Sequence, residues 1–441
     1  MNAGQAAAFS GGWDLQTWLE HLEQHSQVLM GLDRVAAVYH RLLPAGLAMP
    51  AVVVGGTNGK GSTVAYLEAI YRVAGYRTGA YFSPHLERFN ERLVFDGRPV
   101  DDQSLCAAFE QVASAAGETP LTYFEFTTLA AFWLMEQQAV DVALLEVGLG
   151  GRLDAVNVVD AAVAVVTSIG TDHADWLGEG REAVGYEKAG IARTGRPLLC
   201  GDPDPPSSFL EAVGAHGGVL YRLGGEFGHA RSADAWTCRL PGGRLLEGLP
   251  LPRMPGSVQL DNAACALSAV SLLRQKLPVA ETALRGGIGA AFQPARLEHW
   301  IRDGVVWVVD VAHNLEAMQV LVAELTQRHR VPGRRHMLFA AYDDKPIEAM
   351  VALLADHVDH WRLAPLGGKR AASLGRLEAA VRTVSTRPID TFGQLDPALE
   401  SLHDTVCPGD EVVAAGSFAV AGPVRCFLRQ HGFVGVQDFL S

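Results

Sequence analysis

A glycine-rich segment with a single lysine follows an apolar run near the start of the chain. It begins after Ala51–Val54, precedes a helix-like stretch at 63–74, and reads Gly55-Gly56-Thr57-Asn58-Gly59-Lys60-Gly61-Ser62. A strand, a glycine-rich turn and a helix N-terminus in this order form a phosphate cradle, because backbone N–H groups and the helix dipole face the anion. Lys60 can reach the β- and γ-phosphates of a nucleotide, and a hydroxyl of Ser62 or Thr63 would lie near a bound Mg²⁺. The segment therefore predicts a nucleotide-binding loop.

This loop departs from the strict Walker pattern G-x-x-x-x-G-K-S/T. Counting back from Gly59-Lys60, the first glycine slot holds Val54, and Gly61 replaces the hydroxyl residue that should follow the lysine. Taken alone, the segment has an alternative interpretation as a glycine-rich turn with a solvated lysine.

Four other polar groups lie at or just beyond the ends of apolar strands. Ser83 follows 79–82, Glu146 ends 142–145, His173 follows 163–169, and Lys188 lies on the next helix. In open α/β sheets, ligands bind beyond the carboxyl ends of the strands. Hydroxyl and carboxylate oxygens suit Mg²⁺, whereas histidine is a less usual ligand for it. With the phosphate loop, the group predicts a magnesium site.

Each of these residues also has a structural interpretation. Ser83 precedes Pro84, a common arrangement in turns, and His173 fits a satisfied core or surface histidine. Glu146 is harder to explain structurally, because a buried carboxylate without a cation or hydrogen-bond partner is strongly destabilising.

A second set of polar residues lies in the C-terminal half. Asp310 and His313 follow the apolar run that starts at Val305, and Asn314 is placed to cap the next helix. A later strand ends in Ala415-Gly416-Ser417-Phe418, a turn able to accept an anionic group. Asn262 and Arg296 flank the expected domain boundary, where a guanidinium can contact phosphate.

Two alternating series of β-branched runs and helical patterns predict two α/β domains with largely parallel sheets. In the first series, strands are expected at 51–55, 78–82, 141–147, 161–168 and 197–200, with helices near 63–74, 102–116, 125–138 and 180–192. Between 201 and 255 we expect loops and short antiparallel strands, and a helix follows at 260–277. In the second series, strands are expected at 305–311, 336–341, 361–364, 388–391 and 411–415, with helices near 314–329, 346–357 and 373–383. The boundary is expected in Gly286–Pro294, where glycines and a proline loosen the chain.

Bulk properties narrow the class of protein. A chain of 441 residues with a net charge of −13 has no basic field for nucleic acid or an anionic membrane. Its six cysteines are scattered without a C-x-x-C pair, which favours reduced thiols in a cytoplasm. The first residues lack the pattern of a signal peptide, and no apolar stretch is long enough to span a bilayer. We expect a soluble protein.

The motifs together resemble the folylpolyglutamate synthase/dihydrofolate synthase family, relatives of the Mur peptidoglycan ligases. They occur in family order between about residues 31 and 422, and they comprise residues 56–62, Ser83-Pro84-His85-Leu86, Phe124-Glu125-Phe126-Thr127, 145–153 (LEVGLGGRL), Asp172-His173, 187–191 and 310–314. The folate branch places glycine after the loop lysine, which accounts for Gly61. Two mild departures are Gly56, where alanine is usual, and Leu315, where proline often follows.

The resemblance implies an N-terminal P-loop NTPase-like, Mur-ligase-type domain (residues 1–290) that binds ATP and a pterin. It also implies a smaller Rossmann-like glutamate-ligase domain (295–441). The reaction would use ATP to convert a substrate carboxylate into an acyl phosphate, which the amine of L-glutamate then attacks. Dihydropteroate and reduced folates would be the acceptors, with one or two Mg²⁺ ions, in a cytoplasmic enzyme that we expect to be a monomer.

The resemblance also implies roles for individual residues. The metal ligands would be Ser83, Glu146, His173 and a carbamylated Lys188. The ATP contacts would be Thr57, Asn58, Gly59, Lys60, Gly61, Ser62, Asn262, Arg296 and Asp310. Lys60, Lys188, Asp310 and His313 would be catalytic, and His313 and Ser417 would receive glutamate. The pterin end would be held by Met30, Gly31, Leu32, Thr122, Tyr123, Phe124, Glu125, Leu153, Asp154 and Ala155, although Phe124 fits a core role equally well.

Three alternatives stay open. One is a monofunctional folylpolyglutamate synthase, and the second is a Mur-type UDP-muramyl peptide ligase, which Gly61 disfavours. The third is a non-catalytic nucleotide-binding switch, which would be expected to lack some of Lys60, Glu146, His173, Lys188 or Asp310, yet all are present.

Overall fold

The computed structural model describes residues 12–24, 31–172, 174–327 and 331–436. They form two compact units. The first comprises the described residues of Met1–His85, Phe89–Pro252 and Gln259–Phe292, and the second those of Leu86–Arg88, Arg253–Val258 and Gln293–Ser441. None of the described helices is both long and apolar enough to span a membrane.

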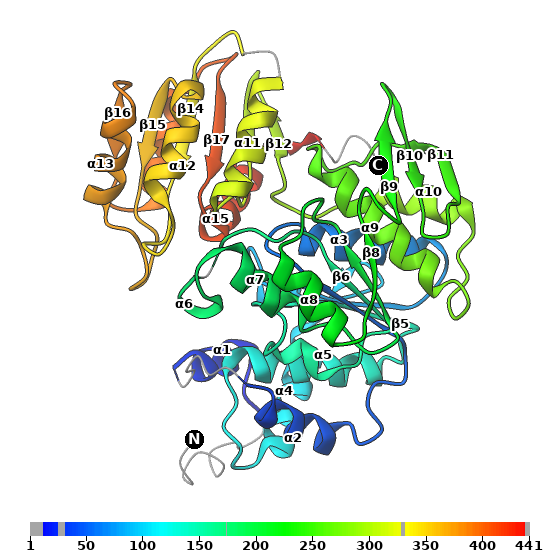
Figure 1. Ribbon diagram of the computed structural model, residues 1–441. Coiled ribbons are helices and arrows are strands. Elements are labelled where there is room, and N and C mark those ends of the chain that lie inside the picture. Colours follow the sequence, from blue (N-terminus) through cyan, green and yellow to red (C-terminus); the bar gives the residue numbers. More distant parts are fainter. Residues whose placement is uncertain (1–11, 25–30, 173, 328–330, 437–441) are drawn as a thin grey trace. The chain divides into compact units, whose positions relative to one another are not determined.

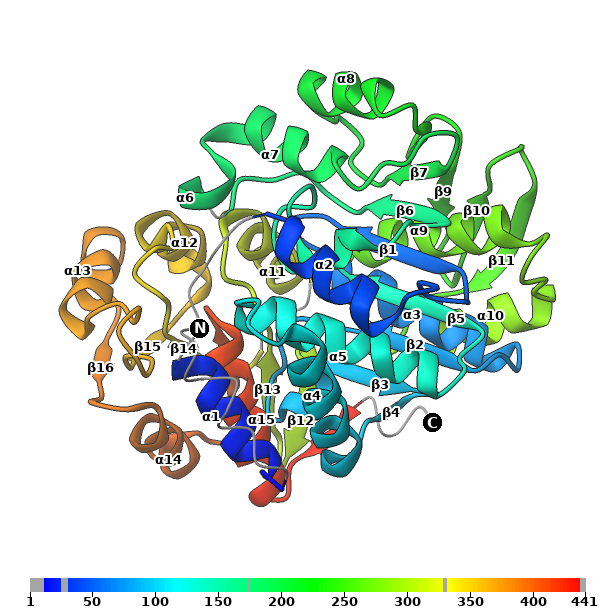
Figure 2. The same cartoon turned by 90° about the horizontal axis from the view of Figure 1, so that it is seen from below.

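The first unit is built on an eight-stranded sheet with the order β4-β3-β2-β5-β1-β6-β7-β8 (Figure 1), most of which can be followed in Figure 2. Its strands are β1 (Ala51–Gly55), β2 (Thr78–Tyr81), β3 (Leu93–Phe95), β4 (Arg98–Pro99), β5 (Val142–Glu146), β6 (Val163–Val166), β7 (Pro197–Cys200) and β8 (Val219–Arg222). The strands from β2 to β8 in that order pair in parallel, and β3 and β4 form an antiparallel edge. β1 and β5 are buried along their whole length, as expected for strands covered on both faces.

Helices cover both faces of this sheet. They are α1 (Leu15–Gln24), α2 (Asp33–Leu42), α3 (Lys60–Val73), α4 (Asp102–Ala116), α5 (Tyr123–Gln137), α6 (Ala174–Leu177), α7 (Gly180–Ala189), α8 (Ser207–Ala215), α9 (Val258–Leu273) and α10 (Glu281–Ala290). Helix α3 lies on one face, and α2, α4 and α5 lie on the other (Figures 1 and 2). The core on the second face includes Val53, Ala143 and Leu145 from the central strands.

Two sequence-based expectations for the first unit are wrong in detail. Helix α3 begins at Lys60 and not at 63, because Gly59 adopts a left-handed conformation (φ 86°) that turns the loop directly into the helix. Gly286, Gly287 and Gly289 do not loosen a linker, since they lie inside α10. A Cβ on Gly287 would lie 2.6 Å from Cγ1 of Ile70 on α3, so glycine permits close packing of the two helices there.

The segment after β7 has more regular structure than the sequence predicts. The expected antiparallel strands are present as a three-stranded sheet of β9 (Gly228–Arg231), β10 (Ala235–Arg239) and β11 (Leu245–Pro250), with β10 in the centre. Helix α8 and the parallel strand β8 were not predicted. Strand β8 extends the main sheet by pairing with β7.

The second unit contains a seven-stranded sheet with the order β16-β15-β14-β17-β13-β12-β18. Its strands are β12 (Glu298–Arg302), β13 (Val305–Val309), β14 (Arg335–Phe339), β15 (His360–Leu363), β16 (Ile389–Thr391), β17 (Glu411–Ala415) and β18 (Val434–Gly435), and its helices are α11 (Leu315–Gln327), α12 (Ile347–Leu354), α13 (Leu374–Val384), α14 (Leu395–Thr405) and α15 (Phe418–Gln430). The five strands from β16 to β13 are parallel, and β12 and β18 are antiparallel at the edge.

The strands of the second unit direct alternate residues to two cores. Met337 and Phe339 of β14 pack with α11, α12 and α13, whereas Leu338 packs with α14 and α15. This alternation follows from the period of two in a β-strand. Both units therefore confirm the predicted α/β class with parallel-rich sheets.

Candidate active site

The carboxyl ends of four neighbouring parallel strands bring several predicted residues to one edge of the first sheet. Strands β2, β5, β1 and β6 are adjacent. Ser83 follows β2, Glu146 ends β5, the glycine-rich loop follows β1, and Ser168 follows β6. The backbone N–H of Ser83 donates to Oε2 of Glu146 at 3.1 Å, and Glu146 is buried. The structure thus brings together two of the predicted metal ligands.

The lysine of the glycine-rich loop folds back over its own turn. Its Nζ donates to the carbonyl oxygens of Gly56 (3.1 Å) and Thr57 (3.2 Å). The hydroxyl of Thr57 donates to the Gly170 carbonyl at 3.1 Å and accepts from the Gly170 N–H at 3.0 Å. The loop and the segment after β6 are therefore locked to each other beside the N-terminus of α3, where the helix dipole favours an anion.

Two hydroxyl residues that sequence reasoning missed hold this loop. Thr167 Oγ1 and Ser168 Oγ donate to the Asn58 carbonyl at 2.5 and 3.1 Å, respectively. The Asn58 N–H donates in turn to Ser168 Oγ at 3.0 Å. The sequence does place Thr167 and Ser168 at the end of a predicted strand. It does not show that their hydroxyl groups contact Asn58.

Asn262, predicted to contact ATP, lies directly against the loop. A Cβ on Gly59 would lie 3.1 Å from Cγ of Asn262, in addition to the strain of its positive φ. Asn262 Nδ2 donates to Oε1 of Gln259 at 3.2 Å, and Gln259 Nε2 approaches Ser62 Oγ at 3.5 Å. Gln259 on α9 was not predicted, and it links two predicted site residues.

Burial shifts the pKa of two other predicted site residues, Lys188 and Asp154. Lys188 is 3% exposed, and burial together with the nearby charge of Lys60 lowers its pKa to about 7. Asp172 and Asp154 act in the opposite direction. Burial raises the pKa of Asp154 to about 6, although the backbone N–H groups of Leu149 and Val156 donate to it at 2.8 and 2.9 Å. Near pH 7, about half of the Lys188 side chains are therefore uncharged.

The donor chemistry at this edge fits a hard divalent cation. Ser83 and Glu146 supply hydroxyl and carboxylate oxygens, which Mg²⁺ prefers. The buried Oγ1 of Thr63, in the first turn of α3, has no hydrogen-bond partner among the described residues. His173 lies outside the described residues, and within the described ranges no cluster of three or more His, Cys, Asp or Glu side chains is arranged for a metal.

The predicted pterin residues at the start of α5 are two polar residues that cap the helix, Thr122 and Glu125, and two aromatic residues, Tyr123 and Phe124. Thr122 and Glu125 form a capping box, with the Glu125 N–H donating to Thr122 Oγ1 at 3.1 Å and the Thr122 N–H to Glu125 Oε2 at 2.7 Å. Arg34 on α2 donates to the other oxygen of Glu125 at 2.9 Å. This ion pair brings Gly31 and Leu32, which precede α2, towards the same helix end. Met30 lies outside the described residues.

Tyr123 and Phe124 pack against different residues. Phe124 packs so closely on Gly148 that a Cβ there would lie 2.5 Å from its ring. Tyr123 contacts Phe89 edge-on, and Arg92 lies 5.6 Å from its ring centre.

The loop from Leu153 to Ala155 ends in a short 3₁₀ turn, Ala155–Val158. Asp154 caps this turn by accepting the Val156 N–H. Leu153 and Ala155 therefore flank a carboxylate that is fixed by backbone contacts.

In the second unit, adjacent parallel strands bring the other predicted residues to one edge. β13 pairs with β17, so that Asp310 and Ser417 follow neighbouring strand ends. Ser417 caps α15 by accepting the Ala419 N–H at 3.1 Å. His313 Nδ1 donates to the Val311 carbonyl at 2.8 Å, which leaves Nε2 as the other ring nitrogen. Asn314 accepts the Ala317 N–H at 2.9 Å, so the predicted helix cap is confirmed.

Phe418 is a centre of this second cluster that the sequence did not reveal. The guanidinium carbon of Arg296 lies 5.4 Å from its ring centre, and the His313 ring lies 5.7 Å away. Burial raises the pKa of Asp310, with Arg296 opposing that effect. Arg296, Asp310, His313 and Ser417 are thus brought together within one unit.

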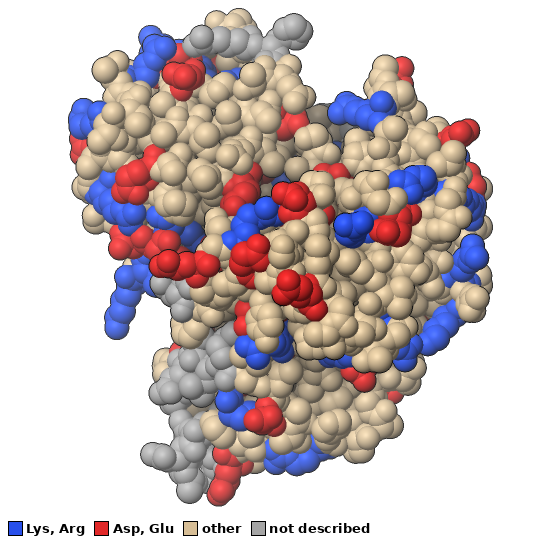
Figure 3. Space-filling view, viewed as in Figure 1, with Lys and Arg blue, Asp and Glu red and all other residues tan. Residues whose placement is uncertain are grey.

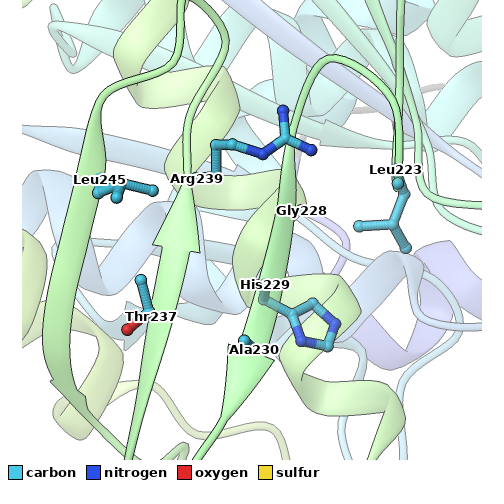
Figure 4. Close-up of a pocket in the computed structure, with 8 residues that line it drawn as sticks. Leu223, Gly228, His229, Ala230, Thr237, Arg239 and Leu245 are labelled. Atoms are coloured by element: carbon cyan, nitrogen blue, oxygen red, sulfur yellow. The ribbon is translucent and has the colours of Figure 1, made fainter.

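A cavity of about 450 Å³ lies elsewhere, beside the three-stranded sheet (Figure 4). Its lining residues are Leu223, Gly224, Gly228, His229, Ala230, Thr237, Arg239 and Leu245, and none of them is a predicted site residue. His229 Nε2 lies 2.7 Å from Oδ1 of Asp261, next to Asn262 in the chain.

The face seen in Figure 3 carries acidic and basic side chains interspersed, without a broad basic field over the described residues. Because the chain has a net charge of −13, a phosphate ligand of the first unit would need local positive charge, which Lys60 and the N-terminus of α3 offer.

Comparisons with known proteins identify the family of both α/β domains. Residues 54–196 match the Mur ligase middle domain, and residues 295–418 match the glutamate ligase domain of Mur ligases. The chain is 42% identical over 368 residues to the dihydrofolate synthase/folylpolyglutamate synthase of Escherichia coli, covering 82% of this chain and 84% of that protein.

Solved structures show the same relationship. E. coli FolC in complex with DHPP and ADP superposes with a TM-score of 0.89 at 38% identity, covering 95% of this chain and 99% of that one. A bifunctional folylpolyglutamate synthase/dihydrofolate synthase with Mn, AMPPNP and L-glutamate bound gives a TM-score of 0.86 at 39% identity, with 95% and 98% covered. The chain belongs to the dihydrofolate synthase/folylpolyglutamate synthase family of Mur-type ligases.

Proposed function

We propose that this protein is an ATP-dependent ligase that adds L-glutamate to dihydropteroate and to reduced folates. The observation that carries the proposal is the junction after β1, where a lysine-bearing phosphate loop adjoins the Ser83–Glu146 pair. Relatives with the same two domains are named for both reactions. A monofunctional folylpolyglutamate synthase is the nearest alternative.

In the proposed first step, an oxygen of the substrate carboxylate attacks the γ-phosphorus of ATP, and ADP leaves. The loop N–H groups and Lys60 hold the phosphates and offset the charge that develops on the transferred group. Ser83, Glu146, His173 and a carbamylated Lys188 would hold Mg²⁺. When bound, this ion supplies positive charge at the phosphates.

In the second step, the amine of glutamate attacks the acyl carbon, loses a proton, and expels phosphate. We propose that His313 and Ser417 receive glutamate, and that Asn262, Arg296 and Asp310 contact the nucleotide. Tyr123 and Phe124 offer flat surfaces to the pterin ring, Asp154 offers a carboxylate, and Gly31, Leu32, Leu153 and Ala155 complete its surroundings. Thr122 and Glu125 support this region mainly by capping α5.

The test measures ADP and phosphate release by purified protein with dihydropteroate plus glutamate, and separately with tetrahydrofolate plus glutamate. We expect both mixtures to release ADP with stoichiometric amide formation. With an ¹⁸O-labelled substrate carboxylate, one label should appear in phosphate, because the acyl phosphate transfers that oxygen. Release only with tetrahydrofolate would identify the monofunctional alternative, and release in neither mixture would refute the proposal.

We also propose a cytoplasmic location. All six cysteines are free thiols, and Cys200, Cys238 and Cys265 are buried, as suits a reducing compartment. Cell fractionation with a tagged protein would test this, and recovery from an oxidising compartment would contradict it.

A further inference from the structure

Arg296 lies between two non-glycine residues with left-handed backbones. The φ angles are 54° for Ala295 and 50° for Leu297. In this region the Cβ of an L-residue crowds the following carbonyl oxygen, so alanine and leucine rarely adopt it. Such a conformation persists only where the surroundings hold it, and it is concentrated at functional sites. The contacts around Arg296 identify what holds this segment.

Two carboxylates fix the two left-handed residues. The Ala295 N–H donates to Oε2 of Glu298 at 2.8 Å, and the Leu297 N–H donates to Oδ2 of Asp310 at 2.8 Å. Asp310 also accepts the N–H of Ala312 at 2.7 Å. Asp310 was predicted as a site residue from its place at a strand end. Glu298, only 3% exposed at the start of β12, was not.

Glu298 is itself held by an arginine. Arg425 Nε donates to Oε2 of Glu298 at 2.8 Å, and its guanidinium carbon lies 5.9 Å from the Trp300 ring centre. Arg425 Nη1 donates to Glu87, which also accepts from Arg429. Burial acts to raise the pKa of Glu87, but these two arginines hold it below its ordinary value. Glu298 therefore belongs to an ion-pair network in which Arg425 bridges Glu298 and Glu87, and Arg429 also pairs with Glu87.

Helix α15 supports Arg296 at two points. Phe418, its first residue, lies under the Arg296 guanidinium. Arg425, two turns further along, holds Glu298 and through it the backbone of Ala295. Two residues of α15, Phe418 and Arg425, thus contact Arg296 or the segment that carries it.

We propose that Glu298, held by Arg425, is a positioning residue that fixes Arg296 in the orientation in which it contacts the phosphates of ATP. This inference rests on the proposed function, in which Arg296 is a nucleotide contact. Glu298 takes part in no chemical step under this proposal. Its loss should therefore weaken the binding of ATP and leave the binding of the other substrates unchanged.

The experiment compares Glu298→Ala and Glu298→Gln with the wild type in the full-length protein. Loss of the carboxylate frees the Ala295 backbone, so Glu298→Ala should raise KM for ATP and Kd for ADP by about tenfold, the value of one good hydrogen bond. The KM for glutamate should stay unchanged. Glu298→Gln keeps one acceptor oxygen and should show a smaller effect of the same kind.

A double-mutant cycle separates positioning from a general structural role. Arg296→Ala should weaken ADP binding, and adding Glu298→Ala should weaken it little further, because the second change acts through the first residue. Ala295→Gly in the Glu298→Ala background should recover part of the affinity, since glycine adopts positive φ without strain. Glu378→Ala, which removes an exposed ion pair with Arg382, is the matched control and should change neither constant.

The outcomes are distinguishable. If Arg296→Ala weakens ADP binding and Glu298→Ala does not, the inference is wrong and the proposed function stands. Fully additive effects, or a loss of kcat with unchanged KM for ATP, would also overturn it. If the wild type binds ADP and the cycle behaves as expected but no ligation occurs, the proposed function fails while the positioning role survives.

Discussion

At the scale of single residues, the charge and reactivity of a side chain depend on its burial and on its hydrogen bonds. Among the described residues, the Lys60 ammonium donates only to carbonyl oxygens of its own loop, so the fold depends little on it. Lys188 is enclosed, and its charge state is set by burial. These two lysines therefore predict different experiments.

Replacing Lys60 with alanine should abolish turnover while leaving the fold intact. Loss of a positive group at the transferred phosphoryl should lower kcat by about 10²–10³-fold. The free energy of unfolding should change by no more than about 0.5 kcal/mol. Steady-state kinetics and urea unfolding measure the two effects, and Lys276→Ala, at an exposed position on the same unit, is the control. Near-normal turnover in folded Lys60→Ala protein would remove the loop from the active site.

The low pKa of Lys188 predicts a dependence on CO₂. Because burial lowers this pKa to about 7, the amine is mostly neutral above pH 7 and can form a carbamate. Activity should fall in CO₂-depleted buffer at pH 8 and recover with bicarbonate, whereas Lys188→Ala should be inactive in both. Below pH 6 the amine is protonated and recovery should be weak. Full activity of Lys188→Ala would show that the carbamate is not required.

At the scale of elements, helices and strands approach each other as closely as their side chains allow. Helix α10 packs on α3 through Gly287, whereas nothing lies within 4 Å of a Cβ built on Gly289 of the same helix. The two glycines of this helix therefore differ, because Gly287 lies against α3 whereas Gly289 borders open space. Strands β14 and β15 place buried His336 beside partly buried His360, with ring centres 5.6 Å apart.

The two glycines of α10 provide a matched pair of substitutions. Gly287→Ala should lower the free energy of unfolding by about 1–3 kcal/mol, because the added methyl collides with the backbone of Ile70. Gly289→Ala should raise it by about 0.5–1 kcal/mol through helix propensity. Denaturant unfolding measures both. Equal effects from the two substitutions would contradict this packing.

His336 on β14 should make the protein sensitive to acid. It is 3% exposed, and burial lowers its pKa, with Asp410 opposing and Arg362 and His360 assisting. The unfolded chain therefore binds a proton near pH 6.5 before the folded chain does, so stability should fall as the pH drops below about 6.5.

The variant His336→Leu should lose less unfolding free energy than the wild type between pH 7.5 and 5.5. Denaturant unfolding at each pH measures this, and His216→Gln, at an exposed position, should follow the wild type. A parallel decline in His336→Leu would assign the acid sensitivity to other groups.

At the scale of the whole molecule, the predicted residues are divided between two units. The phosphate loop, Ser83, Glu146 and Lys188 belong to the first, whereas Arg296, Asp310, His313 and Ser417 belong to the second. Under the proposed function, each unit alone lacks part of the required set. The expected monomer must supply both parts from one chain.

Mixing two inactive variants tests this expectation. Lys60→Ala is defective in the first unit and His313→Ala in the second, so in a monomer no molecule in the mixture holds an intact set. We therefore expect no recovery of ligase activity at any mixing ratio or protein concentration. Recovery that rises with concentration would mean that two chains share their residues. Light scattering on the wild type would then have to show a dimer.

The sequence by itself determined the parallel α/β class, the phosphate loop and the grouping of residues at strand ends. Periodicity locates strands, and the carboxyl ends of adjacent parallel strands meet at one edge, so Ser83, Glu146 and the loop were predictable together. The family motifs added the roles. The match of the chain to that family confirms the identification, and solved relatives hold ADP, or Mn with AMPPNP.

Only the tertiary structure decided which side chains support those residues. Thr167 holds Asn58 from 109 positions away, and Arg425 reaches Glu87 across 338. Gly287 looked like a linker residue until its contact with Ile70 placed it in a helix interface. Local propensity and spacing carry information over a few turns of chain, whereas these contacts depend on distances between segments that only the packed fold brings together.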